Sequence, residues 1–539
     1  MAILVCNVSM PLDGDIEQLL AAAAKRLRVP REAIRTYAVV RRSIDARRHR
    51  PLRFNYHVEV GLHESLPLER RRVARLHRND VRIITPPERH DPEPGTEPLR
   101  HRPVVIGFGP GGMFAALRLA QYGYRPIVLE RGRDVRRRHY DVLKRFIKDK
   151  MLNPESNYLF GEGGAGTYSD GKLYTRIGDP LVRTVLEIFY RHGAGPDILV
   201  DARPHIGSDV LPGICRRMRA HIERLGGEVR FDSRVDDVAV QGDKLVSLLV
   251  GDAVLDAGPT ILAIGQSARD TIRLLARRGV ALAPKPFQVG VRIEHPQDQV
   301  DRWQYGDAAG HERLPPAEYR LVAKGAAGEH GDVFSFCMCP GGTILPTGES
   351  PDLIATNGAS RSRRSGCFAN AGLVITINLS PAREDVLAGP AYLEKLERRA
   401  FELAGGDYRA PAQRAADFLA GRASNGHYEG SYPFGVTWCP LADLLPANVV
   451  SALDTGLRML DERMPGFAGP DAVMVAPETR ASAPLRILRD PTSREAVATE
   501  NLYPAGEGAG YAGGIVSAAV DGLKTADTII ARYSPKSLG

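Results

Sequence analysis

One segment of this 539-residue chain restricts its fold more than any other, the glycine-rich run Gly107–Gly112 (GFGPGG). It follows a short apolar run, Val104–Ile106, and precedes a stretch with helical periodicity that ends near Tyr122. A second apolar run, Ile127–Leu129, comes next. Strand, glycine-rich turn, helix and second strand are typical of a β-α-β unit in which the pattern G-x-G-x-x-G forms the first turn.

The glycines of this run have different physical roles. Gly107 allows a tight turn, Gly109 lets the backbone approach a pyrophosphate, and Gly112 lets the helix pack closely on the sheet. The phosphates would meet free backbone N–H groups and the positive end of the helix dipole. Glu130, at the end of the second strand, is the acid expected to bind the ribose hydroxyls and to repel a 2′-phosphate. A plain strand–turn–helix is the alternative, but the full context favours dinucleotide binding.

Two later segments indicate which dinucleotide binds. Thr260–Gly265 and Leu502–Gly508 are similar to two segments of flavoproteins of the glutathione-reductase type. In that class the first returns the chain to the FAD domain and the second holds the ribityl chain. The acid of the second segment is Glu507 here, where that class has the shorter Asp. Gly513–Ile515 then opens a final helix, which in that class points at the flavin. The resemblance implies FAD as the cofactor.

A second glycine-rich segment, Phe160–Leu173, has five glycines within the twelve positions 160–171. In related flavoproteins a loop of this kind packs against the flavin and the pyrophosphate. A surface loop is the alternative, but Ser169, Asp170 and Lys172 favour a nest that faces the cofactor. The expected cofactor contacts are Gly107, Gly109, Gly111, Gly112, Glu130, Arg131, Gly164, Gly166, Ser169, Lys172, Val235, Gly265, Gly506, Glu507, Gly513, Gly514 and Ile515.

Over nearly its whole length the chain resembles a bacterial family of FAD-dependent dehydrogenase-like proteins. The segments that carry this resemblance are Arg42–Arg47, Glu162–Lys172, Phe334–Gly342, Glu478–Arg480 and Gly506–Gly514. The resemblance implies a fold and a cofactor, and it names no substrate.

The predicted fold class is α/β. We expect a small N-terminal α+β domain (1–85), a linker rich in proline and charge (86–102), and a Rossmann-type, glutathione-reductase-like FAD-binding domain in two parts (103–284 and 476–539). A mixed β/α substrate domain (285–475) interrupts the FAD-binding domain. The expected strands are Ile3–Val8, Ile34–Arg42, Leu52–Val60, Pro259–Ile264, Phe287–Ile293, Val333–Cys339, Leu373–Ile377 and Leu502–Ala505, and Glu228–Val250 is expected to be a meander. The expected helices are Asp15–Leu27, Val210–Leu225, Tyr392–Leu403 and Ile515–Tyr533.

The inserted domain is expected to supply the catalytic side chains. Lys285–His295 alternates with strand period, which places Arg292 on one face and leaves His295 as a candidate general acid or base. A solvated strand end is the alternative for His295. Arg480 is close in sequence to the last FAD segment, where an arginine suits an anionic substrate or the phosphates of a nicotinamide donor. Ion pairing with Glu478 is its alternative role.

Cys337 and Cys339 share one face of the predicted strand Val333–Cys339. In a regular strand their Cα atoms are about 6.6 Å apart at ~3.3 Å per residue, near the upper limit for a disulfide. An internal disulfide relay like that of the thioredoxin reductases is therefore not favoured. We expect buried small hydrophobes, with Cys337 as a single reactive thiolate, and so a catalytic candidate, as the alternative.

Composition excludes several classes of protein. The chain is 43% hydrophobic and has no apolar run long enough to span a bilayer, so we expect a cytoplasmic protein without a membrane partner. Its six cysteines show no metal-ligand spacing, so no metal site is expected. The net charge of +8 comes from arginines spread along the chain and interleaved with acids, so a nucleic-acid partner is the weaker alternative to a small, anionic substrate.

Three functions remain open at this stage. The favoured one is an FAD-dependent oxidoreductase (a dehydrogenase or reductase) that transfers a hydride between a small substrate or NAD(P)H and N5 of the flavin. No second G-x-G-x-x-G follows a strand, so NAD(P)H would bind without a Rossmann domain of its own. The second is an FAD-dependent RNA-modifying enzyme that docks RNA on residues 1–85. The third is a non-catalytic FAD-binding or assembly protein.

Overall fold

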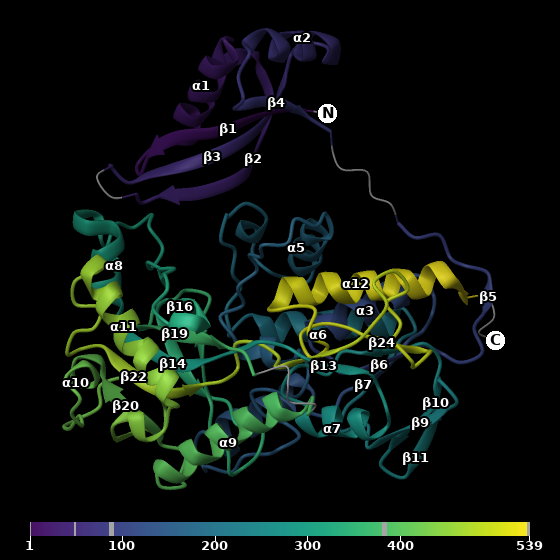
Figure 1. The fold of residues 1–539 in the computed structure, drawn as a ribbon. Helices are drawn as coiled ribbons and strands as arrows, with labels where there is room; N and C mark the ends of the chain where they lie inside the picture. Colours follow the sequence, from purple (N-terminus) through teal and green to yellow (C-terminus); the bar gives the residue numbers. More distant parts are fainter. Residues whose placement is uncertain (1, 48–49, 86–90, 380–384, 536–539) are drawn as a thin grey trace.

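The computed structural model describes residues 2–47, 50–85, 91–379 and 385–535, and its three largest sheets carry the architecture (Figure 1). The first is antiparallel and has the strand order β2-β3-β1-β4. Its strands are β1 (Ala2–Pro11), β2 (Ile34–Asp45), β3 (Arg53–Leu62) and β4 (Val81–Ile84), and its helices are α1 (Ile16–Leu27) and α2 (Leu66–Leu76). Helix α1 packs on this sheet because Leu20, Ala23 and Leu27 form one apolar stripe.

One contact of this N-terminal unit with the rest of the chain lies at one end of β2. The guanidinium of Arg42 pairs with Asp201 (Nε to Oδ1, 2.8 Å). The backbone N–H of Arg42 also donates to the carbonyl of Val200, and the N–H of Ala202 donates to the carbonyl of Arg42 (2.8 Å each). Side-chain and backbone bonds together hold β2 beside the segment 200–202.

The described part of the predicted linker packs against the rest of the chain. Residues 86–90 lie outside the described residues. Further on, Leu99 is buried, and the N–H of Gly95 donates to the carbonyl of Ile530 (2.8 Å). Strand β5 (Glu97–Pro98) pairs in parallel with β25 (Tyr533–Ser534). The segment therefore runs along the end of the last helix.

A five-stranded parallel sheet with the order β24-β12-β6-β7-β8 forms the centre of the part that the sequence predicts to bind a dinucleotide, which we call the dinucleotide-binding part. Its strands are β6 (Val104–Ile106), β7 (Ile127–Leu129), β8 (Glu228–Arg230), β12 (Thr260–Leu262) and β24 (Leu502–Pro504). Its side chains are buried on both faces, as expected for a parallel sheet. One face is covered by α3 (Pro110–Gln121), α5 (Leu181–Arg191), α6 (Leu211–Arg224) and α12 (Ile515–Arg532). The other is covered by α7 (Arg269–Arg277) and by β9 (Asp237–Gln241), β10 (Lys244–Val250) and β11 (Ala253–Asp256).

The strand order of this sheet brings four loops together at one edge. Because all five strands run in parallel, their carboxyl ends lie at one edge. The segments that follow β6, β7, β12 and β24 begin at Gly107, Glu130, Ala263 and Ala505. Segments almost 400 positions apart in the sequence therefore meet at this edge.

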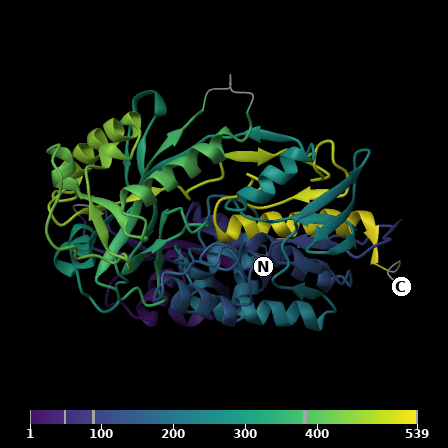
Figure 2. The same cartoon turned by 90° about the horizontal axis from the view of Figure 1, so that it is seen from below.

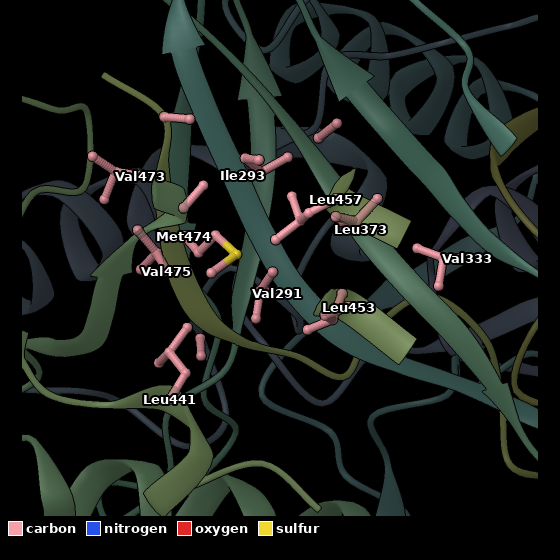
Figure 3. Packing of buried hydrophobic residues seen from close by; sticks show 14 of the residues in the cluster. Val291, Ile293, Val333, Leu373, Leu441, Leu453, Leu457, Val473, Met474 and Val475 are labelled. Atoms are coloured by element: carbon pink, nitrogen blue, oxygen red, sulfur yellow. The ribbon is translucent and has the colours of Figure 1, made fainter. Parts of the chain in front are cut away.

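The third sheet belongs to the inserted part and has the order β15-β16-β19-β14-β22-β20-β21. Its strands are β14 (Phe287–Pro296), β15 (Val322–Ala323), β16 (Val333–Cys339), β19 (Phe368–Ile377), β20 (Ala410–Arg414), β21 (Val436–Trp438) and β22 (Val473–Glu478). Helix α11 (Ala447–Arg463) packs Leu453 and Leu457 near Val291, Val333 and Leu373 of the sheet (Figure 3). The other helices of this part are α8 (Gln297–Tyr305), α9 (Ala388–Leu403) and α10 (Ala415–Leu419).

The inserted part lies beside the dinucleotide-binding part (Figure 2). The chain passes between the two at β13 (Leu282–Pro284) and β23 (Leu485–Ile487), which pair with each other. A small hairpin of β17 (Gly342–Pro346) and β18 (Thr356–Ser360) completes the inserted part. Within the described ranges, no helix is both long enough and apolar enough to cross a membrane.

Candidate functional site

A cavity of about 960 Å³ lies at the carboxyl edge of the parallel sheet and extends to the inserted part. This volume is at the upper end of the usual range for ligand pockets, about 300–1,000 Å³. Its walls come from the turn after β6, the ends of β7, β12 and β24, and the strand β16. The expected cofactor contacts that line it are Gly107, Gly109, Gly111, Glu130, Arg131, Gly164, Gly166, Ser169, Lys172, Val235, Gly265, Gly506, Glu507, Gly513, Gly514 and Ile515.

Gly112 lies behind the wall. A Cβ on Gly112 would come within 2.0 Å of the carbonyl oxygen of Gly107. The absence of a side chain is what allows α3 to start so close to β6, which is the packing role expected for this glycine.

The turn after β6 presents backbone donors to the cavity. Gly107 has a φ of +94°, which favours glycine. Gly109 is the N-cap of α3 and has no side-chain cap, so the first N–H groups of this helix stay open to a ligand. A Cβ on Gly109 would have only the Cα of Gly164 within 4 Å, at 3.8 Å, so its direction is open. Free donors at a helix N-terminus suit a phosphate.

Glu130 ties this turn to the second glycine-rich segment. Its buried carboxylate accepts hydrogen bonds from the backbone N–H groups of Phe108 (2.8 Å), Gly132 (2.9 Å) and Gly161 (2.9 Å). A carboxylate has about four acceptor positions. One therefore remains for a ribose hydroxyl, and the ribose contact of Glu130 stays a prediction.

A buried arginine that the sequence analysis missed holds the second glycine-rich segment in place. The guanidinium of Arg138 donates to the carbonyl oxygens of Asn157 (2.8 Å), Tyr158 (3.1 Å), Glu162 (2.8 Å) and Gly164 (2.9 Å). Burial lowers the pKa of Arg138. In the sequence this residue stands among several arginines, which gives no sign that it is the buried one.

The polar end of this segment carries a buried ion cluster. Asp170 pairs with Lys172 (3.1 Å) and with Arg364 (2.8 Å). Burial alone would raise the pKa of Asp170, but the two cations lower it to about 2. Ser169 accepts a hydrogen bond from the N–H of Gly171 (3.1 Å) and so fixes the turn before Lys172.

His295 is not at the site, and its predicted role as an acid or base is wrong. Its Nε2 lies 2.8 Å from the carbonyl oxygen of Phe467, and its ring packs against the rings of Trp303 and Phe467. Burial lowers the pKa of His295 to about 4, so the ring is neutral at neutral pH. The alternative of a solvated strand end is also wrong, because both faces of β14 are covered.

Arg292 lies directly behind the cavity wall rather than in it. Its fully buried guanidinium donates to Glu478 (3.1 Å) and to the carbonyl oxygen of Cys337 (2.9 Å). Cys337 itself lines the cavity. Arg292 is therefore a positioning residue for Cys337.

Arg480 lines the cavity but is bound on its inner side. Its guanidinium pairs with Glu397 (2.9 Å) and with Glu349, and Arg269 pairs with the same two acids (2.8 Å each). Ion pairing with Glu478 was the alternative role expected for Arg480. The carboxylate of Glu478 instead accepts a hydrogen bond from the backbone N–H of Arg480 (3.1 Å). This network joins the inserted part to α7.

Glu507 lies at the start of α12. Its carboxylate accepts hydrogen bonds from the side-chain amide of Gln266 (2.9 Å) and from the N–H of Gly514 (3.4 Å). Burial raises the pKa of Glu507 to about 7. Gly514, the N-cap of α12, has no side-chain cap, and nothing lies within 4 Å of a Cβ placed on it. The cavity thus has a second open helix N-terminus, beside an acid that titrates near neutral pH.

Because of Glu507, we expect the apoprotein to lose stability as the pH rises from about 4.3 to 7. The unfolded chain releases this proton near pH ~4.3, while the folded chain holds it until about pH 7. Between these values the folded state binds more protons, so the free energy of unfolding falls with rising pH. The expected loss is at most about 3 kcal/mol, and Glu507→Gln should lack it. Urea unfolding of both proteins across this range is the measurement, and parallel curves would contradict the expectation.

These features fit FAD. Two open helix N-termini, those of α3 and α12, line one cavity. The acid Glu130, at the end of β7, lines the same cavity. Neither Gly109 nor Gly514 has a side chain that would fill the space in front of its helix. The donor set therefore suits a ligand with a pyrophosphate and a second region of developing negative charge.

Comparison with known proteins agrees with this cofactor. Residues 286–481 match a family model described as "FAD-dependent protein, C-terminal domain-like", and residues 2–61 match a domain of unknown function. A Clostridium beijerinckii protein with the name "Uncharacterized protein" is 40% identical over 536 residues, which cover 99% of each chain.

Several solved structures are similar at low identity. L-amino acid deaminase from Proteus vulgaris is 10% identical with a TM-score of 0.37, and the match covers 84% of this chain and 99% of that one. Glycine oxidase from Bacillus cereus is 9% identical with a TM-score of 0.34, with 80% and 95% covered. On the family match, the near full-length relative and the site, the chain belongs to the same family as this relative, a family of FAD-dependent proteins, and FAD is its cofactor.

Proposed function

We propose that this enzyme transfers a hydride between a small anionic substrate and N5 of FAD, bound in a domain arranged as in the glutathione-reductase type. The observation that carries the proposal is the cavity at the carboxyl edge of the parallel sheet. It joins the two helix N-termini to side chains of the inserted part. When bound, FAD supplies two-electron chemistry, because its ring accepts or donates a hydride.

In this proposal the chain's own residues bind, orient and move protons. The turn after β6 and the start of α3 hold the pyrophosphate, and Glu130 holds the adenosine ribose. Glu507 can keep or release a proton near neutral pH, as a general acid or base requires. Arg292 and the Arg480 network hold the opposite wall in place.

An anionic substrate is supported by the charge of the cavity. Lys285, Arg176, Arg203 and Arg320 line it, and Glu318 pairs with Arg203 (2.7 Å). The excess of positive charge would attract carboxylates or phosphates. A nicotinamide donor carries phosphates as well, so the same side chains suit NAD(P)H as the reductant.

The experiment is an anaerobic reduction of the yellow protein with NADH, NADPH and a panel of small carboxylates and phosphates. We expect at least one of them to bleach the flavin. Arg176→Gln should raise the KM for that compound by about 10-fold or more, since a hydrogen bond to a charged group contributes ~1.5–3 kcal/mol. Arg191→Gln, on the exposed side of α5, is the matched control. An unchanged KM in Arg176→Gln would show that Arg176 does not bind the substrate.

An FAD-dependent RNA-modifying enzyme remains the second candidate. The supporting observation is that β2 of the N-terminal unit binds the segment that ends at the cavity-lining Ala202 and Arg203. A docked RNA would then lie near the cavity. Strongly salt-dependent tRNA binding by the whole protein, lost on charge reversal in β2, would favour this function.

A further inference from the structure

The strand β16 is irregular where it carries two cysteines. It pairs with β19 through Phe336, opposite Gly372, and next through Cys339, opposite Asn370. Three steps along β16 match two along β19, so β16 has one extra residue, a β-bulge. Cys337 has a φ of +42°, a conformation rare for residues with a side chain. The regular strand expected from the sequence is wrong at this point.

The bulge brings the two thiols together at the cavity. The Cys339 thiol donates a hydrogen bond to the carbonyl oxygen of Cys337 (3.3 Å). Cys337 lines the cavity, whereas Cys339 is fully buried directly behind it. The sulfur of Cys337 therefore faces the cofactor cavity, and the sulfur of Cys339 lies behind it.

Two cations from different parts of the chain meet at this pair. Nζ of Lys172, in the second glycine-rich segment, lies 3.7 Å from Sγ of Cys339, and the guanidinium of Arg292 lies at 3.8 Å. Their acid partners, Asp170 and Glu478, are each 3.1 Å from the respective cation. Buried cations of this kind favour a thiolate over a thiol.

The electrostatics follow from these contacts. The neighbouring Cys339 side chain, and then the charges of Lys172 and Arg292, lower the pKa of Cys337 against the opposing effect of burial. The neighbouring Cys337 side chain and burial raise the pKa of Cys339. These directions favour a pair with one thiolate and one thiol, and Cys337 lines the cavity, so its surroundings favour the alternative role as a reactive thiolate over that of a buried small hydrophobe.

We propose that Cys337 and Cys339 form a redox-active dithiol–disulfide pair that exchanges two electrons with FAD. When the S–S bond forms, the Cys337 thiolate and the Cys339 thiol together release two electrons and one proton. FAD takes up both and becomes its anionic reduced form. In the reverse direction the reduced flavin breaks the S–S bond, and Lys172 and Arg292 stabilise the thiolate that forms. The proposal rests on FAD as the cofactor and does not depend on the substrate.

The first test counts electrons. Wild-type holoprotein purified in air is titrated anaerobically with dithionite until the flavin is fully reduced. We expect four electrons per FAD, two for the disulfide and two for the flavin. Cys337→Ser and Cys339→Ser should each take up two. Cys367→Ser, an exposed cysteine that does not line the cavity, is the control and should keep four. Wild-type protein that accepts only two electrons would overturn the proposal.

The second test uses wild-type protein alone, so it holds even where a variant fails to fold. Cleavage after Lys324 and Arg361 gives one tryptic peptide that contains Cys337 and Cys339 and no other cysteine. After denaturation in N-ethylmaleimide, we expect no label on this peptide from air-oxidised protein and two labels from the anaerobically reduced protein. Two labels in both samples would contradict the proposal. If the wild-type protein takes up four electrons from dithionite but no donor of the panel reduces its flavin, only the proposed function is refuted.

Discussion

Replacing Gly109 with valine is expected to abolish FAD retention, with binding weakened by about 100-fold or more. The side chain would enter the open space between the start of α3 and Gly164. Loss of two hydrogen bonds to the charged pyrophosphate, at ~1.5 kcal/mol each, corresponds to roughly 150-fold in affinity. The backbone of Gly109 (φ −74°, ψ −175°) is extended, so valine adopts it without strain. A loss of FAD would therefore result from the valine side chain in the cavity and not from a strained backbone.

The ratio of flavin to protein absorbance after purification measures this effect, followed by titration of the apoprotein with FAD. Gly195→Val is the matched control, because a Cβ there meets nothing within 4 Å and the residue does not line the cavity. It should retain FAD fully. A Gly109→Val protein with the full flavin content would show that the pyrophosphate does not bind at this turn.

Replacing Gly514 with aspartate is expected to lower the reduction potential of the flavin and to slow its reduction. The open N-terminus of α12 favours negative charge, as the anionic reduced flavin carries. A carboxylate at the N-cap opposes this effect. A difference of about 1.4 kcal/mol corresponds to about 30 mV for a two-electron couple.

Any side chain at Gly514 is strained, because its φ is +95°. Gly514→Asn is therefore the control, since it has the same shape and the same strain without the charge. Equilibration of both variants with redox dyes gives the two potentials. We expect the aspartate variant to be the lower of the two by about 30 mV. Equal potentials would show that this helix end does not act on the flavin.

The dinucleotide-binding elements could be predicted because their signals are local. The turn after β6 needs glycines at fixed spacing, and the strands on either side are short apolar runs. The strand Leu502–Pro504 and the helix that begins at Ile515 were also predictable, because a glycine-rich turn separates them. In each case one continuous segment carries the information.

The opposite wall could not be predicted in the same way. A pattern with a period of two shows which side chains share a face, and it does not show which face meets the cavity. His295 was misplaced for this reason. One extra residue in β16 also reverses the alternation, and the pattern of apolar side chains does not reveal it. The bulge decides the position of Cys337.

Long-range contacts were the other obstacle. Arg138 is important because four carbonyl groups converge on it, and these belong to residues 19 to 26 positions away. Arg480 pairs with acids 83 and 131 positions away. In a chain with many arginines, only the fold identifies the buried ones.

The order in which the cavity is assembled has a consequence for biosynthesis. Its lining begins at Ile106 and ends at Ala518, and β24 is the last strand to join the parallel sheet. At a synthesis rate of about 5–20 residues per second, roughly 20–80 s separate the appearance of the first and last lining residues. For the roughly 12–48 s of this interval between the synthesis of Leu262 and that of Leu502, β12 has an unpaired edge, since only β24 covers it. Nascent and truncated chains are therefore exposed to aggregation at this edge, and flavin loading is an event that follows translation.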